Sequence, residues 1–235
     1  MTEAQAWNEE TLVENRMIDQ LQKLGYTYVH GMELDKERTS QIEVILKERL
    51  AESIQRLNPW INENNLNKVV RNVTHMDTTS LMEANQHFHE LLINQLSVQQ
   101  DVGSGRKNQT VKLIDFDNID NNDFIITSQL SYTHANNTIR PDIMLYVNGL
   151  PLVVIECKSP ALPPDEQIGQ GVKQLLRYQQ VNETLFHYNQ FLISTSNDRA
   201  KVGTIGAKVQ HYSTWKEPYP ISVQDVGENR HSKIF

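Results

Sequence analysis

The sequence predicts an α/β protein in which helices pack on a β-sheet. Apolar residues recur at helical spacing through residues 1–100, and strand-like segments follow from residue 111 with a single helix among them. That order of elements is typical of a sheet covered by helices. No internal repeat or clear domain boundary interrupts the chain, so we expect one domain over 1–235, mainly helical in 1–100 and with its sheet core in 110–216.

The helical part is expected to contain two well-marked helices. Residues 10–24 form the first, because apolar residues recur every three or four positions and a glycine follows as a stop signal. Residues 36–57 form the second, which an Asn-Pro pair ends. Helical spacing is weaker in 63–97, and residues 100–109 are expected to be a polar, glycine-containing loop.

The later part of the chain alternates strand-like segments with turn signals. Between the fourth and fifth of these segments, residues 165–181 show helical spacing after a Pro-Pro pair. The predicted strands cover residues 111–116, 123–134, 140–147, 150–158, 189–196 and 200–205.

Composition narrows the classes of function. The net charge of −7 argues weakly against a general nucleic-acid binder, although residues 139–216 hold eight Lys or Arg against six Asp or Glu, leaving −9 for the rest. Such a protein needs a metal or a partner to hold DNA firmly. The single cysteine excludes an intrachain disulfide and a cysteine-rich zinc site. Without an apolar span or signal peptide, we expect a cytoplasmic protein that does not contact a membrane.

Charged residues interrupt the most apolar part of the sequence, RPDIMLYVNGLPLVVIECKSP at 140–160. Asp142 precedes one apolar run, and Glu156 and Lys158 end the next. Alternate side chains of a strand share a face, so Glu156 and Lys158 point one way and Cys157 the other. A carboxylate beside an ammonium can hold a hard cation and stabilise charge, and Asp142 would complete a magnesium site if it lay on the same face.

The turn between the strands decides whether Asp142 reaches that face. The Asn-Gly pair at 148–149 is typical of a two-residue type I′ turn, which with unbroken pairing would place Asp142 opposite Ile155. Glu156 would then point the other way, so a magnesium site requires an odd-length loop or a β-bulge. Without metal, one of two converging carboxylates should show a raised pKa, or Lys158 should lie between them as a surrogate cation. The alternative is a structural salt bridge among the hairpin's charged side chains, Arg140 included.

The helix that follows the hairpin carries side chains suited to a phosphodiester backbone. Gln170, Gln174 and Tyr178 recur at every fourth position and therefore lie along one face. Lys173 and Arg177 lie on the neighbouring stripe. Amide, phenol and cationic groups beside a metal site could bind DNA. The alternative is an ordinary solvated helix face.

These motifs together resemble a known family. The PD pair at 141–142 followed by ECK at 156–158 resembles the PD-(D/E)xK nuclease signature, and QLLRY at 174–178 resembles the QxxxY motif of one branch of those nucleases. The whole hairpin, with RLNPW, VKLIDF, NNDFIITSQ and LFHYNQ, resembles the N-terminal nuclease domain of the restriction (R) subunit of type I restriction-modification enzymes. The likeness covers nearly the whole chain. Cysteine replaces the commoner leucine within ECK, at a position expected to face away from the site.

The resemblance implies a restriction-endonuclease-like fold, a mixed sheet flanked by helices with the N-terminal helical segment packed on it. It also implies that Asp142 and Glu156 bind Mg²⁺, with the backbone carbonyl of Cys157 as a further ligand. Lys158 would orient or activate the attacking water, or stabilise the charge that develops on the phosphate.

The same resemblance assigns roles to the polar helix and to one more acid. Family members usually take a further acidic ligand from the first helix, for which Glu14 is the candidate and Glu10 the substitute. The alternative for Glu14 is a capping box with Thr11, in which its carboxylate would bind the backbone. The side chains that would position DNA or the site are Gln174, Tyr178, Arg177 and Lys173.

By resemblance, the function is magnesium-dependent cleavage of double-stranded DNA after ATP-driven translocation, in a complex with specificity and methyltransferase subunits. The chain lacks a GxxxxGK[ST] phosphate-binding motif, so the helicase and translocase domains that bind ATP are expected to be absent from it. One alternative is a stand-alone repair or type IV-like nuclease of the same fold. Another is a catalytically silent DNA-binding or docking module.

Overall fold

A mixed sheet of six strands forms the centre of the protein, as a computed structural model shows for residues 13–76, 80–94, 96–103, 105–159, 163–196 and 199–214. The strand order is β1-β4-β7-β8-β9-β10, in which β1 and β4 are parallel, β8 and β9 are parallel, and the other neighbours are antiparallel. The predicted α/β class with a mixed sheet is therefore confirmed. The strands are β1 (Thr27–Tyr28), β4 (Phe124–Ser128), β7 (Ile143–Val147), β8 (Leu150–Cys157), β9 (Phe191–Thr195) and β10 (Ala200–Gly203).

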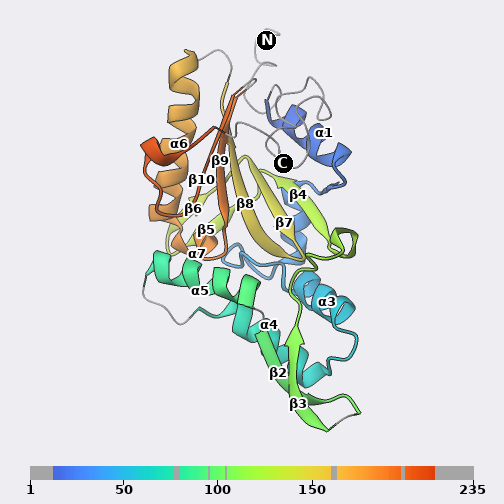
Figure 1. Cartoon of the computed structure of the whole chain (residues 1–235). Coiled ribbons are helices and arrows are strands. Elements are labelled where there is room, and N and C mark those ends of the chain that lie inside the picture. The colour runs from blue at the N-terminus through green and yellow to red at the C-terminus, as the bar shows by residue number, and fades with distance from the viewer. Residues whose placement is uncertain are drawn as a thin grey trace.

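Helices surround this sheet, and two small hairpins lie beside it. In Figure 1, α1 and α6 lie on opposite sides of the sheet, and the β2–β3 hairpin extends away from it past α4. None of the described helices is long and apolar enough to cross a membrane. The helices are α1 (Asn15–Lys23), α2 (Gly31–Leu34), α3 (Lys47–Leu57), α4 (Glu63–Thr74), α5 (Leu81–Asn94), α6 (Pro164–Val181) and α7 (Glu183–Phe186). The hairpins are β2 (Leu96–Asp101) with β3 (Arg106–Val111), and β5 (Tyr132–His134) with β6 (Asn137–Ile139).

The two faces of the sheet belong to two separate apolar clusters. On one face, Met17 and Leu21 of α1 pack with Ile143, Ile155 and Cys157. The alternate residues of the same strands face the larger cluster, which the other helices cover, because successive side chains of a strand point to opposite faces. This alternation later decides where the charged residues of the hairpin point.

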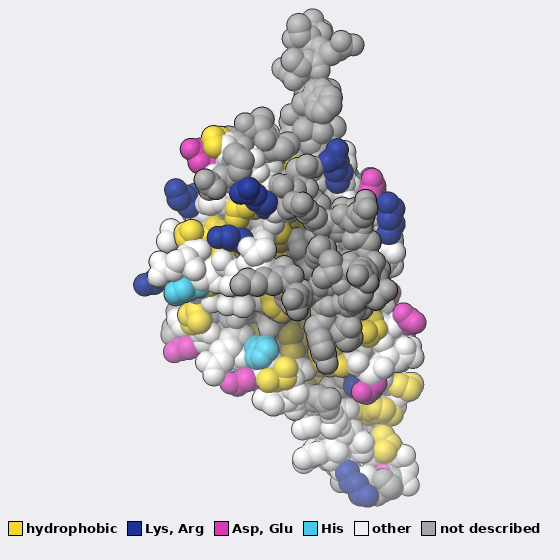
Figure 2. Space-filling view, turned by 45° about the horizontal axis from the view of Figure 1, so that its top comes forward, with side chains coloured by type: hydrophobic (Ala, Val, Ile, Leu, Met, Phe, Trp, Pro, Cys, Tyr) yellow, Lys and Arg dark blue, Asp and Glu magenta, His cyan; other side chains and the backbone are white. Residues whose placement is uncertain are grey.

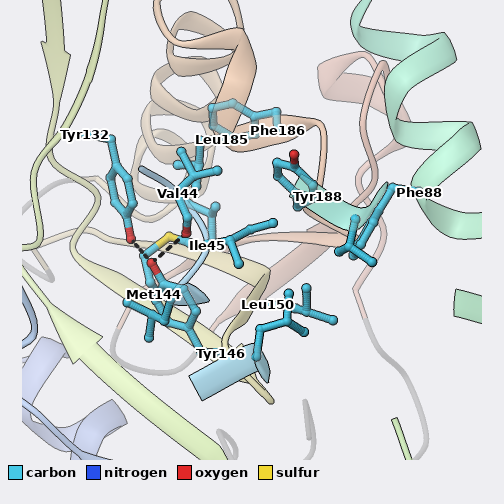
Figure 3. Packing of buried hydrophobic residues seen from close by; sticks show 14 of the residues in the cluster. Val44, Ile45, Phe88, Tyr132, Met144, Tyr146, Leu150, Leu185, Phe186 and Tyr188 are labelled. Carbon is cyan, nitrogen blue, oxygen red and sulfur yellow. Dashed lines mark hydrogen bonds between the residues drawn. The ribbon is translucent and has the colours of Figure 1, made fainter. Parts of the chain in front are cut away.

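The larger cluster contains a buried pair of phenols. The Tyr132 hydroxyl lies 2.7 Å from the Tyr146 hydroxyl, which donates to the carbonyl of Val44 at 3.2 Å (Figure 3). Met144 and Leu150 pack around them in the same cluster. The apolar side of β7 is thereby fixed to the chain before α3.

The helix predictions are confirmed in three places and wrong in one. The helix predicted at 165–181 is α6, and α4 and α5 confirm the helical pattern within 63–97. The helix predicted at 10–24 is confirmed by α1 as far as it is described, since residues 10–12 lie outside the described part. The prediction of helix throughout 36–57 is wrong, because α3 covers only the second half.

The segment before α3 is held in a non-helical form by side chains. The Arg38 side chain, which is 0% exposed, donates to the carbonyls of Glu43 and Ser131. The Glu43 carboxylate accepts from the backbone nitrogen of Thr39 at 2.8 Å. Side chains that bond to nearby backbone compete with helix formation, and periodicity alone does not reveal them.

Two strand predictions and one loop prediction need correction. The segment 123–134 is two strands, because Gln129 adopts a φ of 56° and ends β4. In 111–116 only Val111 belongs to a strand. The segment 100–109, predicted to be a loop, is mostly the β2–β3 hairpin, and its polar residues gave no strand pattern. One of them, Gln100, is buried against α4 and accepts from Asn65 at 2.8 Å.

Candidate active site

The β7–β8 hairpin combines a two-residue turn with a β-bulge. The Asn-Gly pair at 148–149 has φ values of 52° and 79°, as a type I′ turn requires. Tyr146 pairs with Pro151, but Leu145 pairs with Val153, so one residue of β8 has no partner on β7. The sequence-based requirement for an odd loop or a bulge is met by a bulge.

Local chemistry explains where the bulge occurs. Pro151, next to the bulged residue, has no N–H, and proline within sheets is found at edges, at strand starts and at bulges. The extra residue, Leu152, turns its carbonyl toward the chain before β9. There it accepts from the backbone nitrogen of Gln190 at 2.7 Å and from the side-chain amide of Asn189 at 3.0 Å. These bonds fix the bulged residue in place.

The bulge brings the two carboxylates to one face. Ile143 pairs with Ile155 beyond it, and the next step of this register sets Asp142 opposite Glu156. Opposite residues of an antiparallel pair point to the same side. Asp142 and Glu156 therefore share the face that α6 covers, as a magnesium site requires.

Glu156 and Lys158 form a buried ion pair on this face. Their side chains are 0% and 8% exposed, and the Lys158 Nζ atom lies 3.3 Å from Glu156 Oε2. Burial raises the pKa of Glu156 well above its ordinary value, the Asp142 carboxylate raises it further, and the Lys158 ammonium opposes both. The expected raised pKa is thus found at Glu156.

One oxygen of Glu156 has an unusual environment. Its Oε1 atom is buried and has no hydrogen-bond partner among the described residues. A buried carboxylate oxygen without a donor is costly, unless a cation binds there. This atom therefore fits a metal ligand better than it fits a purely structural salt bridge.

Asp142 is fixed against the end of β8. Its Oδ2 atom accepts from the backbone nitrogen of Cys157 at 2.7 Å. The N–H and C=O groups of one strand residue point to the same side, so the Cys157 carbonyl also points toward Asp142. The Cys157 side chain faces α1 instead, as predicted, and burial raises the pKa of its thiol well above the ordinary value.

A glycine allows α6 to lie close to Lys158. A Cβ atom at Gly171 would lie 2.1 Å from Ser194 Oγ and 3.3 Å from Lys158 Cγ. The Ser194 hydroxyl also donates to the Ile168 carbonyl of α6 at 3.0 Å. Gly171 thus serves close packing of the helix on the sheet, next to the side-chain stem of Lys158.

The QxxxY side chains are joined to each other and to the strand that precedes Asp142. Gln174 donates to the Tyr178 hydroxyl at 2.7 Å, and that hydroxyl donates to the Arg140 carbonyl at 3.2 Å. Tyr178 is only 5% exposed, and burial followed by the charge of Glu156 raises its pKa to about 12, so the phenol stays a donor. Its place in the apolar core favours a positioning role over direct contact with DNA.

A cavity of about 680 Å³ opens at this end of the sheet. Exposed Arg177, whose guanidinium carbon lies 5.4 Å from the centre of the Tyr178 ring, contributes to it, whereas exposed Lys173 is not among its lining residues. The end of the molecule where α6 begins is at the top of Figure 1 and is turned toward the viewer in Figure 2. Figure 2 shows Lys and Arg side chains on both sides of the grey atoms. The lining residues are Glu14, Gln129, Thr138, Ile139, Arg140, Asp142, Ser159, Gln174, Arg177 and Tyr178.

The acid of the first helix also reaches this cavity. Glu14 is 1% exposed, and its Oε2 atom accepts from the side-chain amide of Gln129 at 3.0 Å. It stands at the N-cap of α1 without a side-chain capping bond, while Thr11 and the substitute Glu10 lie outside the described residues. Sequence reasoning missed Gln129, which lies inside the predicted strand 123–134 and is the last residue of the NNDFIITSQ segment.

The oxygen donors present suit Mg²⁺ in part. Among the described residues, no three His, Cys, Asp or Glu side chains form a group that could hold a metal by themselves. Mg²⁺ commonly binds one or two carboxylates and takes its other ligands from water and substrate phosphates. Asp142, Glu156 and the Cys157 carbonyl match that smaller requirement.

Comparison with known proteins agrees with these features. A family model described as the type I restriction enzyme R protein N terminus matches residues 6–210. The chain is 32% identical over 224 residues to a Methanocaldococcus jannaschii protein provisionally named as the MjaIXP endonuclease subunit of a type I restriction enzyme, covering 91% of this chain and 21% of that protein. It is 33% identical over 210 residues to the type I restriction enzyme HindI endonuclease subunit of Haemophilus influenzae, covering 87% and 20%. The chain thus spans about a fifth of the length of these relatives.

Proposed function

Because this chain belongs to the family formed by the N-terminal part of type I restriction enzyme R proteins, we propose that it is the magnesium-dependent DNA endonuclease domain of such an enzyme. The observation that carries the proposal is the β-bulge, which sets Asp142 opposite Glu156 with Lys158 beside them. A structural salt bridge would need no such register. The relatives' names as endonuclease subunits support the same function.

Asp142, Glu156 and the backbone carbonyl of Cys157 would hold the metal. Asp142 lines the open cavity, whereas Glu156 is buried beside it with an oxygen that no donor of the described part of the chain reaches. When bound there, Mg²⁺ would neutralise charge on the scissile phosphate and act as a Lewis acid. The bond from the Cys157 nitrogen orients the Asp142 carboxylate before any cation arrives.

Lys158 would act on the attacking water and on the phosphate. Its ammonium can only donate hydrogen bonds, so it would orient the water by donating to it and stabilise negative charge as the phosphodiester is hydrolysed. The close approach of α6 at Gly171 restricts the stem of this lysine. Preorganised charge of this kind acts most strongly where water is excluded, and Lys158 is almost fully buried.

The cationic side chains of the cavity would hold the DNA backbone. Arg177 and Arg140 are exposed and line the cavity that contains Asp142. Gln174 and Tyr178 would position this wall through their bonds to each other and to the Arg140 carbonyl. Lys173 would contribute more distant attraction to phosphate.

The remaining features of the function belong to the whole enzyme. Cleavage would follow ATP-driven translocation by domains beyond this chain, in a cytoplasmic complex with specificity and methyltransferase subunits. ATP would be bound by those other domains. The two rivals, a stand-alone nuclease and a silent docking module, gain no specific support from the described residues.

The test is Asp142→Asn in the full-length R protein, assembled with its partner subunits. DNA cleavage should fall by on the order of 10²-fold or more, while ATP hydrolysis stays at the wild-type rate, because only the metal site is altered. Asp120→Asn, at an exposed acid of the short 3-10 helix before β4, is the matched control. Cleavage by Asp142→Asn within a few-fold of wild type would exclude the proposed site.

A further inference from the structure

Gln129 carries backbone strain at the edge of the cavity. It ends β4 with a φ of 56°, in the left-handed region that residues other than glycine rarely adopt. The other non-glycine residues with positive φ in the described part are Ala135, between β5 and β6, and Asn148, in the type I′ turn. Those two lie in tight hairpin turns, whereas Gln129 lies in a longer connection. Strain of this kind clusters at functional sites, where the surrounding structure maintains it.

The strained residue joins two parts of the candidate site. Its backbone nitrogen donates to the carbonyl of Asp142 at 3.1 Å. Its side-chain amide donates to Glu14 Oε2 at 3.0 Å, across a sequence separation of 115 residues. Gln129 therefore links the residue before β7 to the carboxylate that precedes α1.

The hydrogen bond from Gln129 to Glu14 comes from a neutral amide and does not cancel the charge of the carboxylate. Glu14 is 1% exposed, and its charge acts on the Cys157 thiol together with the charges of Asp142 and Glu156, so these carboxylates gather around the end of β8. An arginine or lysine at position 129 would neutralise Glu14. The neutral amide instead orients the carboxylate and adds no charge of its own.

We propose that Gln129 is a positioning residue, which holds the Glu14 carboxylate at the cavity so that it supports cation binding by Asp142 and Glu156. This inference rests on the proposed function. Gln129 acts through Glu14, by the 3.0 Å hydrogen bond from its side-chain amide to the carboxylate. Its left-handed backbone directs the amide toward Glu14. Partners of this kind, which orient a metal ligand, typically change metal affinity about 10–100-fold when removed.

Two substitutions separate positioning from folding. Gln129→Gly removes the amide and relieves the strain, because glycine adopts positive φ freely. Gln129→Asn keeps an amide and tolerates the left-handed backbone, but it is one methylene too short to reach Glu14 as glutamine does. Relief of the strain should offset part of the lost hydrogen bond to the buried Glu14 carboxylate, so both variants should stay folded and melt near the wild-type temperature.

The measurement is Mn²⁺ affinity of the purified chain, by calorimetry and by electron paramagnetic resonance of the ion, with thermal melting in parallel. We expect Gln129→Gly and Gln129→Asn to bind Mn²⁺ about 10–100-fold more weakly. Glu14→Gln should show a similar loss, and the double variant Glu14→Gln, Gln129→Gly should lose little more, since both act through one bond.

Three results would overturn the inference. They are wild-type affinity in Gln129→Gly, unchanged affinity in Glu14→Gln, and unfolding of both Gln129 variants, which would make the residue structural. Asp142→Ala distinguishes these from a failure of the proposed function. If Asp142→Ala keeps wild-type Mn²⁺ affinity, the metal site itself is wrong. If it abolishes binding while the Gln129 variants bind normally, only the role of Gln129 is wrong.

Discussion

The ammonium of Lys158 lies 3.3 Å from Glu156 Oε2, and both side chains are buried at the end of β8. The lysine thus offsets the charge of one carboxylate, while the other oxygen of that carboxylate has no donor among the residues that the structure describes. A buried ion pair is seldom the most stable choice, since apolar residues of similar size often do as well. Its presence here is better explained by chemistry than by stability.

Lys158→Ala should abolish DNA cleavage by the full-length enzyme and spare ATP hydrolysis. Loss of one preorganised donor typically lowers a catalytic rate by about 10²–10³-fold. Lys201→Ala, on β10 and partly exposed, is the control and should cut at the wild-type rate. Cleavage assays on both variants check this. Cleavage by Lys158→Ala within a few-fold of wild type would rule out its role at the phosphate.

The two glycines at the start of α6 should respond in opposite directions to alanine. Gly171→Ala introduces a Cβ atom 2.1 Å from Ser194 Oγ, so it should destabilise the protein by about 1–3 kcal/mol and impair cleavage through Lys158. Gly169 has open space around it, so Gly169→Ala should gain up to about 1 kcal/mol from helix propensity. Chemical denaturation measures both. Equal behaviour of the two variants would refute the close approach at Gly171.

Tyr178 should show separate effects of its ring and its hydroxyl. Tyr178→Phe keeps the packed ring but loses the bonds to Gln174 and the Arg140 carbonyl, so we expect a loss of about 0.5–1.5 kcal/mol together with weaker cleavage. Tyr178→Ala should cost about 3–5 kcal/mol, because the ring is buried. Denaturation and cleavage assays distinguish them. Normal cleavage by Tyr178→Phe would show that the hydroxyl has only a structural role.

Asp115 should make the stability of the folded protein depend on pH in the acid range. Bonds from the Asn121 amide, the Asn118 nitrogen and Lys112 hold its pKa at about 2, below the ordinary value of 3.8. A depressed pKa stabilises the folded state above the unfolded pKa and loses that effect as pH falls through the folded value. Asp115→Asn should therefore melt lower than wild type near neutral pH, and the difference should shrink from about pH 4 to about pH 2. A constant difference in melting temperature over that range would argue against this origin.

The central hairpin was predictable because its chemistry is local. The Asn-Gly turn, the alternation of apolar side chains and the need for a bulge all follow from residues within 140–158. The contacts that complete the candidate site are not local. Gln129 reaches Glu14 over 115 positions, and the left-handed backbone that directs it has no sequence signature. The non-helical chain before α3 likewise depends on Arg38, whose guanidinium bonds to Ser131 far along the chain.

The most direct test of the metal site is a crystal structure of this chain soaked in Mn²⁺, with the ion located by its anomalous scattering. The ion should lie between Asp142 and Glu156, about 2 Å from an oxygen of each, with Glu156 Oε1 among its ligands. The same soak of Asp142→Ala should show no ion there. Ordered wild-type crystals in which Mn²⁺ binds only elsewhere, and in which Lys158 alone neutralises the two carboxylates, would contradict a metal-dependent nuclease.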